Sequence, residues 1–161
     1  MKKVLSILLS ATLLLLLAAC GGGGNDATEA PDLNQYYEDF MAALGEDNAP
    51  AMIDVEEDFM AQLYPGLENY KLKQAVVKTA MISTTAFEFA LVELEDASKV
   101  QEVADIFQAR IDYQVETGAF YPMTLESWEK AEIITKGSVV ALICAGYQQS
   151  QAVEAFNKLF A

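Results

Sequence analysis

The chain has 161 residues, with 24 Asp and Glu against 10 Lys and Arg, and its formal net charge at neutral pH is −14. This excess of negative charge argues against nucleic-acid binding, because phosphate backbones are held mainly by Lys and Arg. The absence of histidine excludes a Ser–His nucleophile pair and removes the commonest metal ligand.

The first 20 residues have the pattern of an export signal. Two lysines precede an apolar run over residues 4–19, which ends with the small residues Ala18 and Ala19 directly before Cys20. A run of 16 residues is short for a membrane-spanning helix, which usually needs about 20. The stretch LAAC resembles the lipobox of bacterial lipoproteins, which implies a diacylglycerol on the Cys20 sulfur and cleavage just before it. The alternative is an ordinary signal peptide or uncleaved anchor with an incidental cysteine.

These features predict three parts of the chain. Residues 1–19 are the signal peptide, and residues 20–31 are the lipidated cysteine and a flexible tether. Four consecutive glycines make the tether difficult to order. Residues 32–161 are long enough for a single domain with its own core. Without residues 1–19, eight basic residues face 24 acidic ones, and the formal charge becomes −16.

Two helices are predicted at the start of the domain. Apolar residues with helical spacing run from Leu33 to Leu44, with Asp32 as the expected cap and Gly45 at the end. After a loop, apolar positions between residues 55 and 63 predict a second, shorter helix that ends at the sequence YPG.

The aromatic residues of the first helix have two interpretations. Tyr36, Tyr37 and Phe40 lie at helical spacing, and they would either form a shelf for a ligand or pack into the core. Core packing is the commoner outcome for such a stripe.

Two strand pairs and two further helices complete the domain. Residues 71–81 and 87–94 are rich in residues that favour strands, and residues 96–117 have the apolar stripe of a long helix that Gly118 ends. The sequence FYP at 120–122 is expected to be a break after this helix. Residues 130–135 then turn back into 138–145.

The last strand and helix are also recognisable. The run VVALICA is apolar on both faces, which predicts a central strand. Cys144 within this run is expected to be a small buried hydrophobe. Ser150 is the expected cap of a terminal helix. The predicted fold is α+β: two N-terminal helices followed by ββαββα, with helices packed on an antiparallel four-stranded sheet. The strand order stays open.

Candidate ligand-binding residues are few. Asp54, Glu57 and Asp58 come from the acidic run DVEED, whose oxygens are of the kind that Ca²⁺ prefers. Phe59 stands where a calcium loop would need glycine, and solvated acids at a helix start are the alternative. Arg110, the only arginine, is either a bidentate ligand for a carboxylate or an exposed helix residue that relieves local negative charge. No cofactor is expected.

Acidic residues are concentrated in the front half. Residues 26–68 contain 12 of them and no Lys or Arg. They would form either a docking face for cations or a basic partner, or an ordinary solvated surface.

The layout resembles that of small bacterial lipoproteins, mostly of Gram-positive Firmicutes, that carry a domain of unknown function. The resemblance covers about residues 33–160 and rests on an acidic helix with aromatic residues, a segment like DVEEDFMAQLYPGL, a strand like FEFALVEL, and a helix like VQEVADIFQARIDYQ. After these come a Tyr-Pro, a strand–Gly–strand hairpin and a terminal helix. The positions that match are Arg110, Gln114, Tyr121, Pro122, Ala131 and Gly137. Ser138 and Val139 depart from the pattern, where an amide and an aromatic residue are expected. The resemblance implies a surface lipoprotein and supplies no catalytic residues.

The expected function is therefore that of a membrane-anchored extracytoplasmic lipoprotein, a non-catalytic binding or interaction module. Its expected partners are the lipid bilayer, through acylated Cys20, and an envelope protein or small ligand. One alternative is a carboxylate-dependent envelope enzyme, which would need two acids that converge in a pocket. Another is a Ca²⁺-responsive surface protein.

Overall fold

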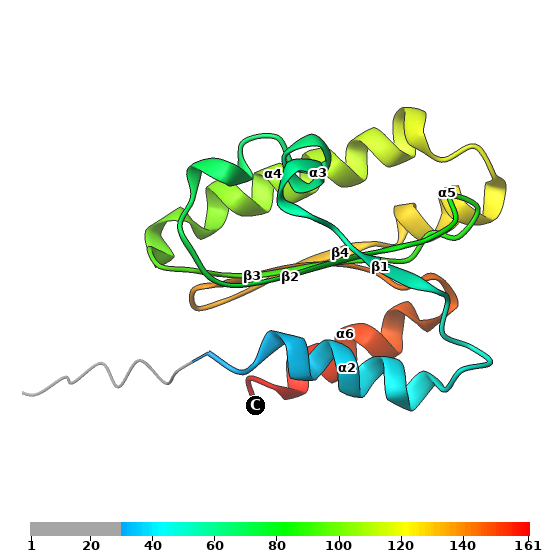
Figure 1. The fold of residues 1–161 in the computed structure, drawn as a ribbon, viewed down its shortest axis with the longest axis horizontal. Helices are drawn as coiled ribbons and strands as arrows, with labels where there is room; N and C mark the ends of the chain where they lie inside the picture. Colours follow the sequence, from blue (N-terminus) through cyan, green and yellow to red (C-terminus); the bar gives the residue numbers. More distant parts are fainter. Residues whose placement is uncertain (1–29) are drawn as a thin grey trace, which may run out of the picture.

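The computed structural model describes residues 30–161. The predicted signal peptide, Cys20 and nearly all of the predicted tether lie outside the described residues. Helices cover both faces of one five-stranded antiparallel sheet (Figure 1), which confirms the α+β class. Within residues 30–161, no helix is both long and apolar enough to cross a membrane.

The described chain alternates between the two helical layers and the sheet. Helical turns marked η are 3₁₀ turns, except η3, which is a turn of π-helix. In chain order the elements are α2 (Leu33–Leu44), β1 (Met52–Asp54), α3 (Glu57–Leu63), η1 (Leu67–Asn69), β2 (Leu72–Ala80), β3 (Glu88–Leu94), η2 (Ala97–Lys99), α4 (Val100–Tyr113), η3 (Gln114–Gly118), α5 (Pro122–Glu129), β4 (Glu132–Lys136), β5 (Val139–Cys144), η4 (Gly146–Gln148) and α6 (Gln149–Lys158).

The strands lie in the order β1-β2-β3-β5-β4. Every neighbouring pair is antiparallel. The prediction of a central strand over VVALICA is confirmed, because β5 lies between β3 and β4 and all of its residues are buried. Gly137 and Ser138 connect β4 to β5, and the positive φ of +59° at Gly137 favours glycine in so short a turn.

Two separate apolar cores hold the layers together. Since side chains alternate between the faces of a strand, β3 directs Ala90 and Val92 toward α4 and directs Phe89 and Leu91 toward α2 and α6. The second core also contains Tyr36, Tyr37 and Phe40. Their burial confirms the core interpretation of that stripe over the ligand shelf.

Two parts of the predicted topology are wrong. The sheet has five strands and not four, because Met52–Asp54 forms β1 and pairs with β2. Val55 belongs to this extended segment, where its N–H donates to the carbonyl of Val77 at 3.0 Å, so the second helix begins only at Glu57. The expected break at 120–122 is present at residues 119–121, but the helix that follows it, α5, with Pro122 in its first turn, was not predicted.

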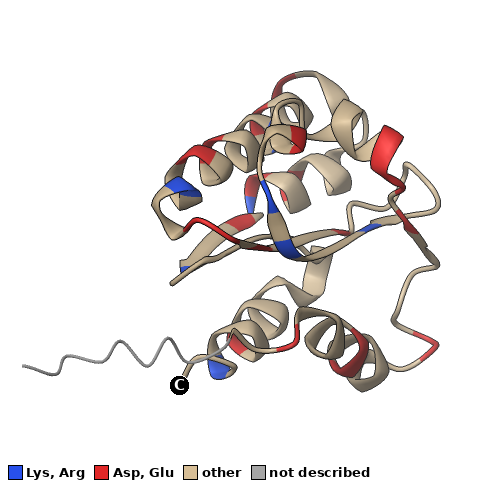
Figure 2. Ribbon diagram, turned by 60° about the vertical axis from the view of Figure 1, so that its left-hand side comes forward, with Lys and Arg blue, Asp and Glu red and all other residues tan. Residues whose placement is uncertain are grey.

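The acidic front half does not form a single face. Helix α2 lies on one side of the sheet and α3 on the other (Figure 1), so the acids on α2 are separated by the sheet from those on α3. Figure 2 shows acidic residues along the helices of both layers. The negative charge of residues 30–68 is therefore distributed around the molecule.

Candidate functional site

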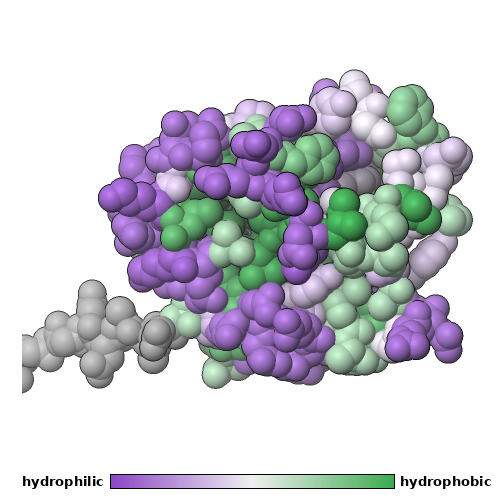
Figure 3. Space-filling model, in the orientation of Figure 1, coloured by the Kyte–Doolittle hydropathy of each residue, from purple (hydrophilic) through white to green (hydrophobic). Residues whose placement is uncertain are grey.

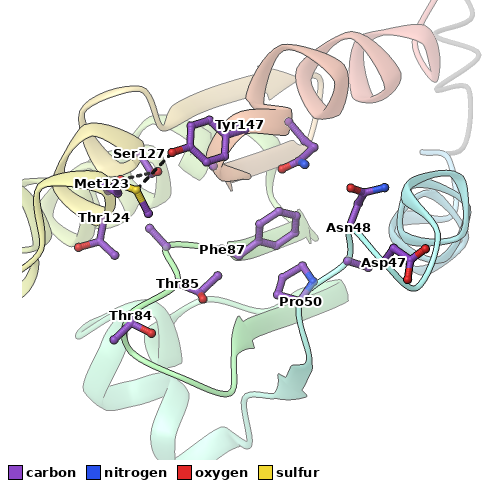
Figure 4. A pocket seen from close by; sticks show the side chains of 14 residues that line it. Asp47, Asn48, Pro50, Thr84, Thr85, Phe87, Met123, Thr124, Ser127 and Tyr147 are labelled. Atoms are coloured by element: carbon purple, nitrogen blue, oxygen red, sulfur yellow. Dashed lines mark hydrogen bonds between the residues drawn. The ribbon is translucent and has the colours of Figure 1, made fainter.

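A cleft of about 330 Å³ opens at the end of the sheet that lies opposite the point where the described chain begins. Four segments line this sheet-end cleft: residues 47–50, residues 84–87 of the β2–β3 loop, the first turns of α5, and η4. Figure 4 shows Tyr147 and Met123 on one side of it and Asp47 and Asn48 on the other, with Phe87 and Pro50 between them.

One wall of the sheet-end cleft is built from α5 and η4. The Tyr147 hydroxyl lies 3.4 Å from the sulfur of Met123, yet 83% of Tyr147 is exposed. Gly146 turns the chain at a φ of +52°, a left-handed conformation that favours glycine, and so directs Tyr147 outward. The wall thus presents an aromatic ring and a thioether to solvent.

The polar groups of the cleft are hydroxyls and amides. The Thr124 hydroxyl donates to the Tyr121 carbonyl, and the Ser127 hydroxyl donates to the Met123 carbonyl, each at 2.8 Å. The Asn48 amide donates to the Leu44 carbonyl at 3.1 Å. None of the described lining residues is basic, and Asp47 is the only acid among them. Such a lining suits an uncharged or cationic group and disfavours an anion.

The cleft does not assemble a nucleophile with a base. Ser127 uses its proton within its own helix, and no described lining residue could act as its base except the distant Asp47, across the cleft in Figure 4. Cys144 lies beneath the cleft, 3.6 Å from the Ser127 carbonyl and 3.7 Å from the Ala86 carbonyl. Burial raises the pKa of its thiol to about 12, so it stays protonated and unreactive at neutral pH.

Apolar side chains extend the cleft onto the surrounding surface. Phe120 is 89% exposed, and Tyr121 and Met123 beside it are also exposed. Met81 and Ile82 are exposed on the loop that supplies Thr84 and Thr85. In Figure 3 apolar residues gather toward this end of the molecule, whereas the end near the start of the described chain is mostly hydrophilic.

The structure places Arg110 in an internal ion pair rather than on the surface. Its Nε and Nη2 donate to the two carboxylate oxygens of Glu88 at 2.9 and 2.8 Å, and the Arg110 side chain is only 10% exposed. Arg110 therefore does hold a carboxylate through two hydrogen bonds, but the carboxylate belongs to β3 of the same chain. The two nitrogens that bind Glu88 are therefore already engaged within the chain.

The groups around this pair complete its hydrogen bonding. Tyr64 donates to Glu88 at 2.6 Å, and Gln114, with its amide oxygen toward Arg110, accepts from that guanidinium at 2.8 Å. Desolvation opposes the charge on Arg110, but its hydrogen bonds and charge interaction with Glu88 raise the pKa of the guanidinium overall. Burial, and then the neighbouring carboxylate, raise the pKa of Tyr64 well above its usual value. The group is a buried structural network.

The acidic candidates are not brought together. The Asp54 carboxylate pairs with the ammonium of Lys78, while Glu57 and Asp58 are exposed in the first turn of α3. Between residues 30 and 161, no group of three acidic or Cys side chains is close enough to hold a metal ion.

None of the residues singled out from the sequence lines the sheet-end cleft. The segments that line the cleft are separated by up to about a hundred positions in the sequence. Its threonine, serine and amide residues lie mainly in loops, where no periodic pattern identifies them as neighbours. One usable signal was present: Phe120, Tyr121 and Met123 form an apolar group outside the stripe of any predicted helix.

A family model described as Domain of unknown function (DUF4358) matches residues 45–145. The matched segment begins just before β1 and ends after β5, and it includes every lining residue of the cleft except those of η4. No curated protein matches the chain, and no solved structure does either.

Proposed function

The chain belongs to the family of domains of unknown function DUF4358, and we propose that it is a lipid-anchored, non-catalytic binding protein outside the cytoplasm. Its binding site is the sheet-end cleft, and its ligand there is a protein partner. The proposal includes an origin in the Gram-positive Firmicutes, which rests on the resemblance of the sequence layout alone.

The observation that carries the binding site is the exposed apolar rim of the cleft. Tyr147 and Met123, which line the cleft and contact each other, are 83% and 60% exposed, and Phe120, just before α5, is 89% exposed. Tyr, Phe and Met are enriched in protein interfaces, and exposed apolar patches with polar rims are typical of interaction sites. A partner would insert an apolar side chain between Tyr147 and Pro50, with hydroxyls and amides available for its backbone.

Three features support a non-catalytic role. The chain has no histidine, Cys144 is buried in its protonated form, and a paired-carboxylate mechanism would need a second acid beside Asp47. General acid–base chemistry requires such groups within hydrogen-bond reach of the substrate.

The attachment to a membrane is supported by the sequence. The positive start, the apolar run and the stretch LAAC ending at Cys20 are the basis for it. Two acyl chains on Cys20 would give stable anchoring, whereas one chain gives only marginal binding. In Figure 1 the described chain enters at the end of the molecule opposite the cleft, so a tethered domain can direct the cleft away from its anchor.

Photo-crosslinking in intact cells tests the binding site. The full chain is produced with p-benzoylphenylalanine in place of Tyr147, and a matched variant has it in place of Tyr113, an exposed tyrosine at the end of α4. We expect a discrete crosslinked product from position 147, at least several-fold above the yield from position 113. Equal products from both positions, or none from position 147, would contradict a protein partner at the cleft.

The attachment is tested in the same cells with Cys20→Ala. The wild-type chain is expected in the membrane fraction with the added mass of a diacylglycerol, and the variant without that mass. An unchanged mass and location in the variant would refute lipidation at Cys20 without affecting the crosslinking result.

A further inference from the structure

Strand β4 forms an open edge of the sheet. It pairs with β5 on one side, and within residues 30–161 no other strand pairs with its opposite side. The free N–H and C=O groups of such an edge are a template for a further strand. The other edge is β1, which has only three residues, whereas β4 has five.

The sequence of β4 is complementary to itself. It reads Glu132-Ile133-Ile134-Thr135-Lys136. If two copies pair antiparallel about a two-fold axis at Ile134, Glu132 of each copy lies opposite Lys136 of the other. Ile133 then lies opposite Thr135. Opposite charges in directly facing cross-strand positions stabilise a pair of strands, and a two-fold interface presents each such pair twice.

Among residues 30–161, neither Glu132 nor Lys136 forms an ion pair. Six of the eight Lys and Arg residues between positions 30 and 161 form ion pairs, and Lys136 is one of the two that do not. Glu132 is exposed and also lacks an ion pair among the described residues. Ile133 and Ile134 are both half-buried, so each retains apolar surface that a facing strand would cover.

We propose that β4 pairs with β4 of a second copy of this chain, which joins the two sheets into one continuous antiparallel sheet. The hairpin turn at Gly137 and the complete pairing of β4 with β5 hold the edge in its extended form before association. Little conformational freedom is then lost on binding. A lysine on an edge strand normally discourages other strands from pairing with that edge. In the pairing centred on Ile134, however, Lys136 of each copy faces Glu132 of the other, so its charge is neutralised.

The register makes a sharp test available. Residues at the two-fold axis face their own counterparts, with Cβ atoms about 4.5–5.5 Å apart. Only a small adjustment is needed for a disulfide, whose Cβ atoms are about 3.5–4.5 Å apart. Ile134→Cys in the full chain should therefore form a covalent dimer when intact cells are treated with a thiol oxidant. The matched control is Thr135→Cys, because residue 135 lies diagonally from its counterpart, about 7–8 Å away, and its replacement leaves both Glu132 and Lys136 in place.

Reversing the charges of Lys136 and Glu132 then distinguishes specific strand pairing from disulfides that form by random collision. In the Ile134→Cys chain, Lys136→Glu places like charges at both ends of the interface and should lower the dimer yield on non-reducing gels about tenfold. Adding Glu132→Lys exchanges the two charges and should restore the yield. The oligomeric state of the full chain with native Ile134, solubilised in mild detergent and measured by sedimentation, should follow the same order.

Several results would overturn the proposal. Equal crosslinking of the Ile134→Cys and Thr135→Cys chains would show contact without the proposed register. If the double charge exchange does not restore the dimer, Glu132 and Lys136 do not face each other in the interface. A covalent adduct of Ile134→Cys with a different protein, in place of the dimer, would assign the edge to another partner. No β4 residue lines the sheet-end cleft, so this result is independent of the proposed function.

Discussion

At the scale of single residues, the stability of the fold is most sensitive to the buried ion pair of Glu88 and Arg110, because both charges need their partners. Two hydrogen bonds join them, and Trp128 covers the guanidinium at 5.3 Å from the ring centre. Within the described residues, no buried side-chain nitrogen or oxygen lacks a hydrogen-bond partner. A buried ion pair contributes little net stability compared with apolar residues, but removal of one partner leaves an uncompensated charge.

Arg110→Met is therefore expected to lower the free energy of unfolding by about 3–5 kcal/mol, because Glu88 remains buried without its counter-charge. The double variant Glu88→Met, Arg110→Met should recover a large part of that loss. Urea unfolding measures both. Lys130→Met is the control, since the Lys130–Glu126 pair is exposed and such pairs contribute about 0–1 kcal/mol. Equal effects of Arg110→Met and Lys130→Met would contradict this account.

This pair also shows a limit of sequence reasoning. A single arginine in the middle of a helix looks the same whether it meets solvent, a ligand or an internal acid, because the partner here lies 22 positions away on β3. Glu88 gave no sign of burial, since it occupies a polar position in an alternating strand. Tertiary contacts decide the role of both residues.

At the scale of elements, regular patterns were the predictable part. The apolar stripes of α2 and α4 and the continuous apolar run of β5 span enough residues to show a period. β1 is too short for any alternation, and α5 is too short for a clear stripe. The cleft was not predictable for the same reason, because it lies among these short elements and loops.

Besides the apolar core, one polar side chain fastens the start of α2 to the sheet. The amide oxygen of Gln74 on β2 accepts from the backbone N–H of Leu33 at 3.0 Å, and its nitrogen donates to the Pro31 carbonyl at 3.2 Å. The same nitrogen donates to Glu93 at 2.9 Å. Gln74 thus fixes the first turn of α2, where the chain enters the described structure.

Gln74→Met should lower the free energy of unfolding by about 1–3 kcal/mol, because the backbone groups at the start of α2 lose their partners. Hydrogen exchange of the first turn of α2 should become faster, and exchange in α4 should not. Gln101→Met is the matched control, since that amide bonds only to Asp105 on its own helix. If both variants change α2 equally, Gln74 does not fasten the helix.

At the scale of the whole molecule, the segment that matches the family does not contain both helical layers. Residues 45–145 include the sheet and the layer of α3, α4 and α5, but neither α2 nor α6. The sheet face beneath α2 and α6 carries Phe89, Leu91 and Ile143, all fully buried in the whole chain. Without those helices this face would be a large apolar surface, which soluble proteins rarely expose.

The fragment 45–145 should therefore fail to fold cooperatively and should bind a hydrophobic dye such as ANS, whereas residues 30–161 should unfold in one transition. Circular dichroism during heating, together with dye fluorescence, distinguishes the two. A sharp transition in the fragment, at a temperature close to that of residues 30–161, would show that α2 and α6 are dispensable.

The direction in which Ile134 points has a consequence for attachment. Ile134 belongs to the core beneath α2 and α6, and directly facing residues in paired strands point to the same side of a sheet. Two copies joined through β4 would therefore carry both α2 helices, and both entering chains, on one side. If each chain is acylated, the pair is bivalent toward a bilayer. Once the first lipid anchor has inserted into the bilayer, the second inserts at a high effective concentration. The dimer should therefore dissociate from the bilayer far more slowly than a single copy.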